Sequence, residues 1–270
     1  MAKRAVAASK HRTAPARPPQ WEWQRPASIA LGLGLWAIVG GVAPDGPLPG
    51  PVAVWDAFLF QWQQENLLGH LLATLRRVVL AFVLAYVGGC ALGLLMGLRR
   101  SADRWLDAAL GLFLNMPALV VIILCYVWFG LTDVAAVLAV AVNKLPLVAV
   151  TVREGARARD RDLEEMGRAY ALGPVQSLRH IVLPQLAPFF LAAARSGLSL
   201  VWKIVLVVEL LGRSDGIGFQ LGLLFQLFDI AGILAVALSF IAVVQVIEAL
   251  VMRPLDRVVS RRYRDLEPIP

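Results

Sequence analysis

The chain has 270 residues, of which 59% are hydrophobic, and its mean hydropathy is +0.68. Soluble domains contain about 45–50% apolar residues, so this composition excludes an ordinary soluble protein and indicates an integral membrane protein. The formal net charge is +7, and the basic residues lie at the ends of apolar runs, so membrane topology explains them better than nucleic-acid binding does.

Six apolar runs have about the 20 residues that a helix needs to cross the bilayer core. They predict an all-α integral membrane protein with six transmembrane helices in one membrane domain, residues 27–252. A basic arm, residues 1–26, precedes this domain and a basic tail, residues 253–270, follows it. The predicted spans are 27–43, 72–98, 106–131, 133–152, 185–211 and 230–252.

The Lys and Arg residues outside these spans are distributed unequally. Nearly all of them lie on the side of the N-terminus, and Arg213 is the exception. Because cytoplasmic segments are enriched in Lys and Arg, both termini are expected in the cytoplasm. The first run also has features of a secretory signal, but Pro44 directly follows its small-residue stretch and the basic arm is long, so an uncleaved helix is expected.

One polar segment, residues 164–184, interrupts the apolar sequence between the fourth and fifth predicted spans. Leu163, Met166 and Tyr170 are spaced as one apolar stripe of a short helix. A Gly-Pro pair at 173–174 is expected to end that helix. The loop is far longer than a connection between two helices needs, so we interpret it as a docking element rather than a segment that only returns the chain.

The same segment resembles the EAA loop in the membrane subunits of binding-protein-dependent, ATP-driven importers, which follows the pattern E-A-A-x(3)-G-x(9)-I-x-L-P. An alignment without gaps places Glu165 at the Glu position. Ile181, Leu183 and Pro184 take the I-x-L-P positions.

Three positions depart from this pattern. Met166 and Gly167 replace the two alanines, and Ala171 replaces the glycine. Because the next glycine is Gly173, the turn of the loop is expected two residues later than in the family, at the Gly-Pro pair.

Four further segments resemble the nitrate/sulfonate/taurine-type branch of these permeases: 70–98, 116–133, 202–221 and 247–264. The resemblance implies a permease subunit in the inner membrane that imports a small, anionic solute by alternating access. It implies three partners: a cytoplasmic ATP-binding subunit, an extracytoplasmic solute-binding protein and a second permease copy. The chain has no G-x(4)-G-K-[ST] phosphate loop, so no cofactor is expected in it and ATP-Mg is assigned to the ATPase subunit.

In this family the loop is a coupling helix that docks on the ATPase subunit. The resemblance therefore implies a coupling loop at about 153–184. Its candidate coupling residues are Glu165, Met166, Gly167, Tyr170, Ala171, Gly173, Ile181, Leu183 and Pro184.

Polar side chains within the spans are candidates for a translocation path, because each charge facing lipid at a helix centre costs about 2.5–3.5 kcal/mol. In one hypothesis Lys144 and Lys203 line a central path and attract an anion; in the other they pair with Glu209 or with carbonyl groups and hold the bundle together. Arg76 and Arg77 are expected to reach the headgroups and to have little function. The candidate path residues are Asn143, Lys144, Arg195, Trp202, Lys203 and Glu209.

Two other function classes remain as alternatives. A six-helix secondary carrier or channel would also need buried charges, but it would have no use for a docking loop. A membrane-embedded enzyme is disfavoured, because the chain has no H-E-x-x-H motif and its three histidines are scattered, so no catalytic or metal-binding set is expected. The solute remains open among nitrate, alkylsulfonates, taurine and neutral heterocycles.

Overall fold

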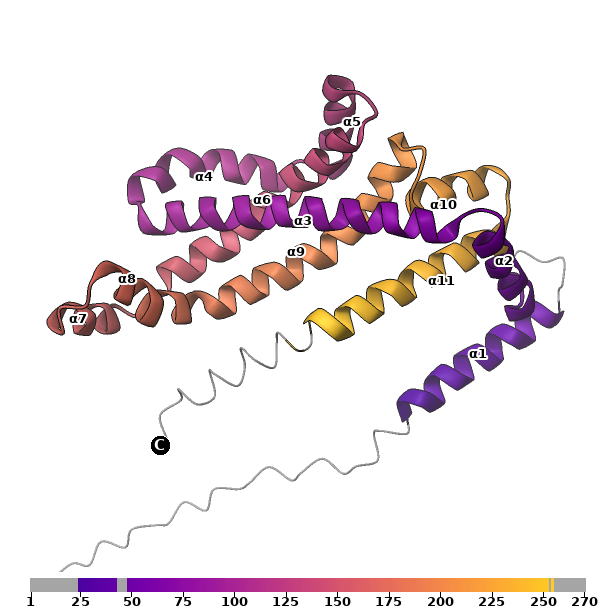
Figure 1. Cartoon of the computed structure of the whole chain (residues 1–270), viewed down its shortest axis with the longest axis horizontal. Helices are drawn as coiled ribbons and strands as arrows, with labels where there is room; N and C mark the ends of the chain where they lie inside the picture. The colour runs from indigo at the N-terminus through magenta and orange to yellow at the C-terminus, as the bar shows by residue number, and fades with distance from the viewer. Residues whose placement is uncertain (1–23, 43–47, 253, 255–270) are drawn as a thin grey trace, which may run out of the picture. The chain divides into compact units, whose positions relative to one another are not determined.

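A computed structural model describes residues 24–42, 48–252 and 254 of the chain (Figure 1). It divides into two structural units, residues 1–53 and 54–270. Every regular element in the described residues is helical. Most of the predicted basic arm and nearly all of the predicted basic tail lie outside the described residues.

The first unit contains α1 (Gln24–Val42) and the first turn of α2 (Pro51–Gln63). Nε1 of Trp36 donates a hydrogen bond to the carbonyl of Pro49 over 3.0 Å. The first predicted span is therefore helical, but its apolar portion, Ala30–Gly41, is shorter than the roughly 20 residues of a complete straight crossing.

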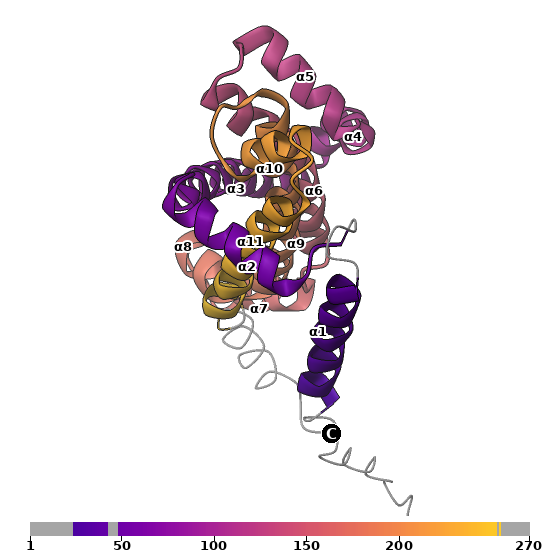
Figure 2. The ribbon, with the colours of Figure 1, turned by 90° about the vertical axis from the view of Figure 1, so that its right-hand side faces the viewer.

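The second unit contains the remaining helices and a bundle built on α6 (Asp133–Arg157). On this bundle α6 packs against both α3 (Leu67–Leu98) and α9 (Leu183–Gly212). The other elements of the unit are α4 (Arg100–Asn115), α5 (Ala118–Phe129), α7 (Arg161–Ala169), α8 (Pro174–Ser177), a π-helical turn (Leu178–Val182), α10 (Ile217–Gln226), α11 (Ile230–Ile247) and a second π-helical turn (Glu248–Met252). Figures 1 and 2 show α4 and α5 at one edge of this bundle.

Close contact between α3 and α6 depends on glycines along one face of α3. A Cβ atom at Gly89 would lie 2.6 Å from Cβ of Val148. One at Gly93 would lie 2.4 Å from the carbonyl oxygen of Ala149, and one at Gly97 would lie 2.4 Å from a side chain of α6. These distances are too short for any side chain, so the small residues bring the two helices together within the chain.

Four helical segments within the described residues are long and apolar enough to cross a membrane: Leu67–Leu98, Asp133–Arg157, Val175–Gly212 and Ile230–Val251. They confirm helices at the second, fourth, fifth and sixth predicted spans. The fourth and fifth extend further than predicted, because α6 continues to Arg157 and the helical segment containing α9 begins at Val175.

The third predicted span, 106–131, is wrong as a single straight helix. Its residues form parts of α4 and α5, which meet at an angle of 98° and give a fifth, bent candidate span. Met116 has an extended backbone, with φ −73° and ψ 125°, and Pro117 follows it. A proline disfavours helical geometry in the residue before it and lacks an N–H group, so the helix breaks here.

Candidate functional site

The EAA-like loop, residues 158–184, runs from the end of α6 into the first residues of α9 and includes α7. The structure corrects the predicted place of its turn. Helix α7 ends at Ala169, and Ala171 has a φ of 50°, in the left-handed region. The N–H of Ala171 donates to the carbonyl of Arg168 over 2.9 Å, and the N–H of Leu172 donates to that of Gly167 over 3.0 Å. These two bonds form a Schellman motif.

The turn therefore lies at the position where the family pattern has glycine, and not two residues later. Gly173 does not have a positive φ. Its partner in the Gly-Pro pair, Pro174, is the first residue of α8, a position where the missing N–H group costs nothing. The Gly-Pro pair thus precedes the next helix instead of ending α7.

The two halves of the EAA-like loop touch at Gly167 and Ile181. Ile181 is 6% exposed, and a Cβ atom at Gly167 would lie 2.5 Å from Cδ1 of Ile181. On the other side of the loop, Glu165, Met166 and Tyr170 are exposed, and Tyr170 reaches 77%. The loop therefore combines an internal contact with an exposed face that carries both apolar and charged groups.

The second half of this loop is continuous with the fifth span. Ser177 and Leu183, on either side of the π-helical turn, both have right-handed helical backbone. Pro184 lies in the first turn of α9, where it does not interrupt the helix. The segment Val175–Gly212 is consequently one continuous helical segment of 38 residues, which we call the rod, with Pro188 inside its α9 portion.

Three candidate path residues of α9 line one cavity of about 800 Å³, together with residues of α11 and the turn that follows it. They are Arg195, Trp202 and Lys203. Nη2 of Arg195 lies 3.4 Å from Oε1 of Glu248, and the indole of Trp202 packs edge-on against Phe240 with ring centroids 5.8 Å apart. Lys203 forms no ion pair with any described residue, so the cavity retains a positive side chain.

The other candidates lie elsewhere. Asn143 and Lys144 are half-buried on α6 and do not line this cavity. Glu209 is 0% exposed and belongs to an ion-pair cluster near the end of α9. Among the described residues its cationic partner is Arg77 and not a lysine, so the hypothesis that Lys144 or Lys203 pairs with Glu209 is not what the structure shows.

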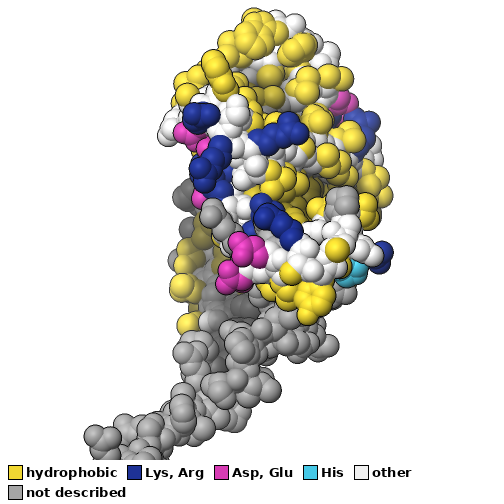
Figure 3. Space-filling model, turned by 90° about the vertical axis from the view of Figure 1, so that its left-hand side faces the viewer, with side chains coloured by type: hydrophobic (Ala, Val, Ile, Leu, Met, Phe, Trp, Pro, Cys, Tyr) yellow, Lys and Arg dark blue, Asp and Glu magenta, His cyan; other side chains and the backbone are white. Residues whose placement is uncertain are grey.

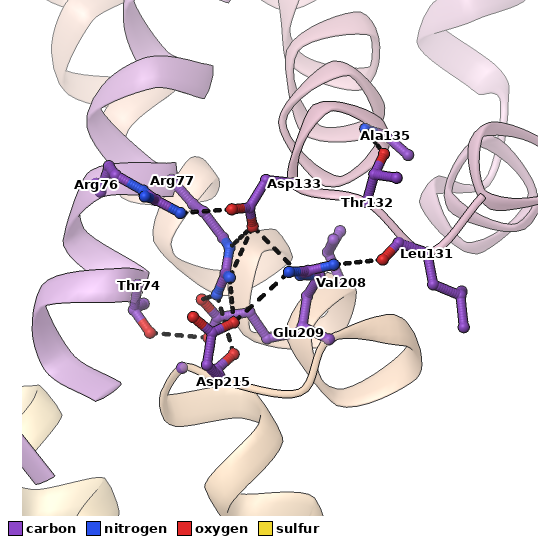
Figure 4. A network of polar contacts seen from close by, with 12 residues as sticks. Thr74, Arg76, Arg77, Leu131, Thr132, Asp133, Ala135, Val208, Glu209 and Asp215 are labelled. Atoms are coloured by element: carbon purple, nitrogen blue, oxygen red, sulfur yellow. Dashed lines mark hydrogen bonds and ion pairs between the residues drawn. The ribbon is translucent and has the colours of Figure 1, made fainter. Parts of the chain in front are cut away.

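We call this group the Arg77 cluster; its members are Thr74, Arg77, Asp133, Glu209 and Asp215 (Figure 4). Nη1 of Arg77 lies 2.7 Å from Oε1 of Glu209 and 3.0 Å from the carbonyl oxygen of Asp215. Nε of Arg77 donates to Oδ1 of Asp133 over 2.8 Å, and Nη2 contacts the carboxylate of Asp215. The cluster ties α3, α6 and α9 to the segment before α10.

The expectation that Arg77 reaches the headgroups is wrong, because its side chain is 1% exposed. Arg76 differs: its side chain is 57% exposed and pairs with Asp133. Arg213 lies 3.2 Å from Asp133 as well. With Arg76 and Arg213 included, three arginines face the three carboxylates of the cluster.

The turn before α10 wraps around the Glu209 carboxylate. Oε2 of Glu209 accepts hydrogen bonds from Oγ1 of Thr74 over 2.8 Å and from the N–H of Gly218 over 2.9 Å. Gly216 has a φ of 105°, and a Cβ atom there would lie 2.4 Å from Cδ of Glu209. Two further backbone N–H groups beside the carboxylate donate hydrogen bonds to side chains of α3. The N–H of Gly216 donates to Nδ1 of His70, and the N–H of Ile217 donates to Oγ1 of Thr74.

Sequence reasoning missed this cluster, although the sequence contains a signal for it. Asp133 and Asp215 flank the outer ends of predicted spans, which is also where Arg77 and Glu209 lie. Opposite charges at matching depth in different spans are candidates for pairing, since an isolated charge at that depth is costly.

The chain is similar in sequence to known membrane transport proteins. Residues 89–265, about two thirds of the chain, match the family model described as "Binding-protein-dependent transport system inner membrane component". The putative aliphatic sulfonates transport permease protein SsuC of Bacillus subtilis is 29% identical over 194 residues, which cover 71% of this chain and 70% of SsuC. The taurine transport system permease protein TauC of Escherichia coli is 25% identical over 252 residues, covering 88% and 91%.

Solved structures agree on the fold. A crystal structure of an amino acid ABC transporter with histidines superposes with a TM-score of 0.58 at 21% identity, covering 77% of this chain and 98% of that chain. The extent of the family match and the apolar helices lead to one conclusion. The chain belongs to the family of binding-protein-dependent transport system inner membrane components and is a multi-pass protein of the inner membrane.

Proposed function

We propose that the chain is the permease subunit of an ATP-driven importer that moves a small anionic solute, of the sulfonate, taurine or nitrate type, into the cytoplasm. It has six spans with both termini in the cytoplasm, and two copies assemble with two copies of a separate ATPase. An extracytoplasmic binding protein delivers the solute, and ATP-Mg belongs to the ATPase. The family membership and the names of the SsuC and TauC relatives support this proposal.

The observation that carries the proposal is the continuous rod Val175–Gly212. At one end it contains the I-x-L-P residues of the EAA-like loop, along its length it lines the cavity with Arg195 and Lys203, and near its far end it contributes Glu209 to the Arg77 cluster. Its α9 portion alone has 30 residues, or roughly 45 Å at 1.5 Å per residue. One continuous helical element thus connects the three places that, in this proposal, move together during transport.

Alternating access follows in this proposal from displacement of the rod. The exposed face with Glu165, Met166 and Tyr170 seats on the ATPase subunit, and closure of two ATPase subunits on ATP shifts the loop. Because α9 packs on α6 and α6 on α3, the shift changes the cavity and the Arg77 cluster in the same step. This is an energetic coupling between distant sites.

An anion suits the cavity because Arg195 and Lys203 both line it, whereas Glu248 is matched by Arg195. The remaining candidate residues have supporting roles in this proposal. Trp202 forms a wall of the cavity and Glu209 anchors the rod. In other conformations, Asn143 and Lys144 face the path.

The proposal is tested by co-expressing the tagged chain with its cognate ATPase subunit and measuring how much ATPase is retained. Glu165→Lys reverses a charge on the exposed loop face and is expected to lower retention at least severalfold, with normal insertion of the chain in the membrane. The matched control is Asp56→Lys on α2, another exposed carboxylate, which is expected to leave retention unchanged. If the wild-type chain retains no ATPase and supports solute uptake without it, the protein is a secondary carrier and the proposal fails.

A further inference from the structure

A second cavity, of about 730 Å³, lies at the opposite end of the bundle from the Arg77 cluster, where α3 ends, α4 begins and α6 ends. Four arginines line it: Arg100 and Arg104 of α4, Arg157 of α6, and Arg159 just after α6. None of these arginines takes part in the proposed coupling face or in the cavity along α9.

The cavity has an excess of positive charge. The acidic residue in its lining is Asp103, and this carboxylate is already shared between Arg157 and Arg153, whose Nη1 lies 3.4 Å from Oδ1. Within the described ranges, neither Arg100 nor Arg104 forms an ion pair. These two arginines are four residues apart on α4, so they lie on the same face of the helix.

The surroundings of the cavity are those of a membrane surface. Arg100 follows the end of the spanning helix α3 at Leu98 by two residues. Along α4 the side chains of Trp105 and Leu112 are 84% and 63% exposed, and an exposed tryptophan beside arginines is typical of the headgroup level of a bilayer. Figure 3 looks onto this end of the molecule and shows Lys and Arg side chains next to a broad hydrophobic surface.

We propose that this cavity binds the phosphate group of an anionic phospholipid, held by Arg100 and Arg104 with Arg157 and Arg159 beside them. The acyl chains of the lipid lie against the exposed apolar side chains of α4. Basic pockets between spanning helices are a recurring way to bind anionic headgroups, and the apolar face of α4 favours a lipid over a free phosphate. The inference depends on the membrane location of the chain and not on the transport function, so its outcome and that of the proposed function are independent.

The test is a lipid titration of the detergent-purified, full-length chain, with bound lipid counted by native mass spectrometry. Dioleoylphosphatidylglycerol is compared with dioleoylphosphatidylcholine, which has the same acyl chains and no net charge. We expect the anionic lipid to bind about tenfold more tightly, and inorganic phosphate at the same concentration not to displace it. Equal binding of the two lipids, or displacement by inorganic phosphate, would overturn the proposal, the latter in favour of a free-phosphate site.

Variants locate the site. Arg100→Gln combined with Arg104→Gln is expected to weaken binding of the anionic lipid by about tenfold or more, since each basic side chain near an anionic surface contributes measurably. Arg99→Gln removes one positive charge, where the double variant removes two, from an exposed neighbour that does not line the cavity. This control is expected to change the affinity less than twofold. Equal affinities of the double variant and the Arg99 variant would contradict the assignment. If the double variant fails to fold, the single variants Arg100→Gln and Arg104→Gln take its place, and each is expected to weaken binding of the anionic lipid more than Arg99→Gln does.

Discussion

Single residues decide the geometry of both ends of the transmembrane rod. Ala171 adopts a left-handed backbone at the turn of the EAA-like loop, and Arg77 holds three carboxylates at the far end. The sequence pattern predicted the loop but misplaced its turn, because it treated the glycine at 173 as the residue with conformational freedom. The hydrogen bond from the N–H of Leu172 to the carbonyl of Gly167 closes a turn of six residues and holds an alanine in the left-handed region instead.

Replacing Ala171 with glycine is expected to stabilise the chain. A left-handed residue with a Cβ atom costs about 1–2 kcal/mol, and glycine removes most of this cost but gains freedom in the unfolded chain. Thermal unfolding of the purified protein should therefore show a higher midpoint for Ala171→Gly. Gly173→Ala is the control, because this glycine does not have a positive φ, and it should not lower the midpoint. A large decrease in the midpoint of Gly173→Ala would indicate that the Gly-Pro pair forms the turn.

Removing Arg77 is expected to be strongly destabilising. Arg77→Ala would leave Glu209 buried without its cation, and loss of one partner of a buried ion pair costs about 3–5 kcal/mol. The adjacent Arg76→Ala removes an exposed partner of Asp133, for which about 0–1 kcal/mol is expected. The effects of the two variants are measured as the thermal unfolding midpoint and the yield of folded protein. Equal effects of the two variants would mean that the buried cluster does not hold the helices together.

At the scale of helices, hydropathy located the long elements well and missed their breaks. The runs that became α3, α6, α9 and α11 were found because a fully apolar helix is visible in composition alone. The bend between α4 and α5 was missed because both flanks of Met116 and Pro117 are apolar, and hydropathy does not register a proline. The short helix α10 was also missed, since its ten residues are fewer than a span requires.

The contact between α3 and α6 gives a prediction for Gly93. A methyl group there would lie 2.4 Å from a backbone carbonyl of α6, which cannot turn aside. Gly93→Ala is therefore expected to separate the helices and to lower the unfolding midpoint. Gly111→Ala on α4, where nothing lies within 4 Å of an added Cβ atom, should instead be neutral or stabilising by up to about 1 kcal/mol. A harmless Gly93→Ala would show that α3 and α6 are not in close contact.

For the whole molecule, composition, the EAA-like loop and four further segments that resemble the family predicted a membrane protein of the importer-permease family. The sequence did not predict the Arg77 cluster, because its members come from three helices and a turn. These residues are far apart in the chain and become neighbours only in the folded structure. Through Glu209 the cluster ties one end of the rod Val175–Gly212 to α3 and α6, and the EAA-like loop presents an exposed face at the other end. In the proposed function, the ATPase subunit attaches at this exposed face and the rod transmits its movement to the cavity.

The most direct test of this account is photocrosslinking in a membrane that contains the chain and its cognate ATPase subunit. A photoreactive phenylalanine is placed at Tyr170, which is 77% exposed on the EAA-like loop, or at Phe228, which is 83% exposed between α10 and α11. If the EAA-like loop contacts the ATPase subunit, position 170 crosslinks to that subunit and position 228 does not. No crosslink from position 170, or equal crosslinking from both, would contradict the claim that this loop is the contact with the ATPase.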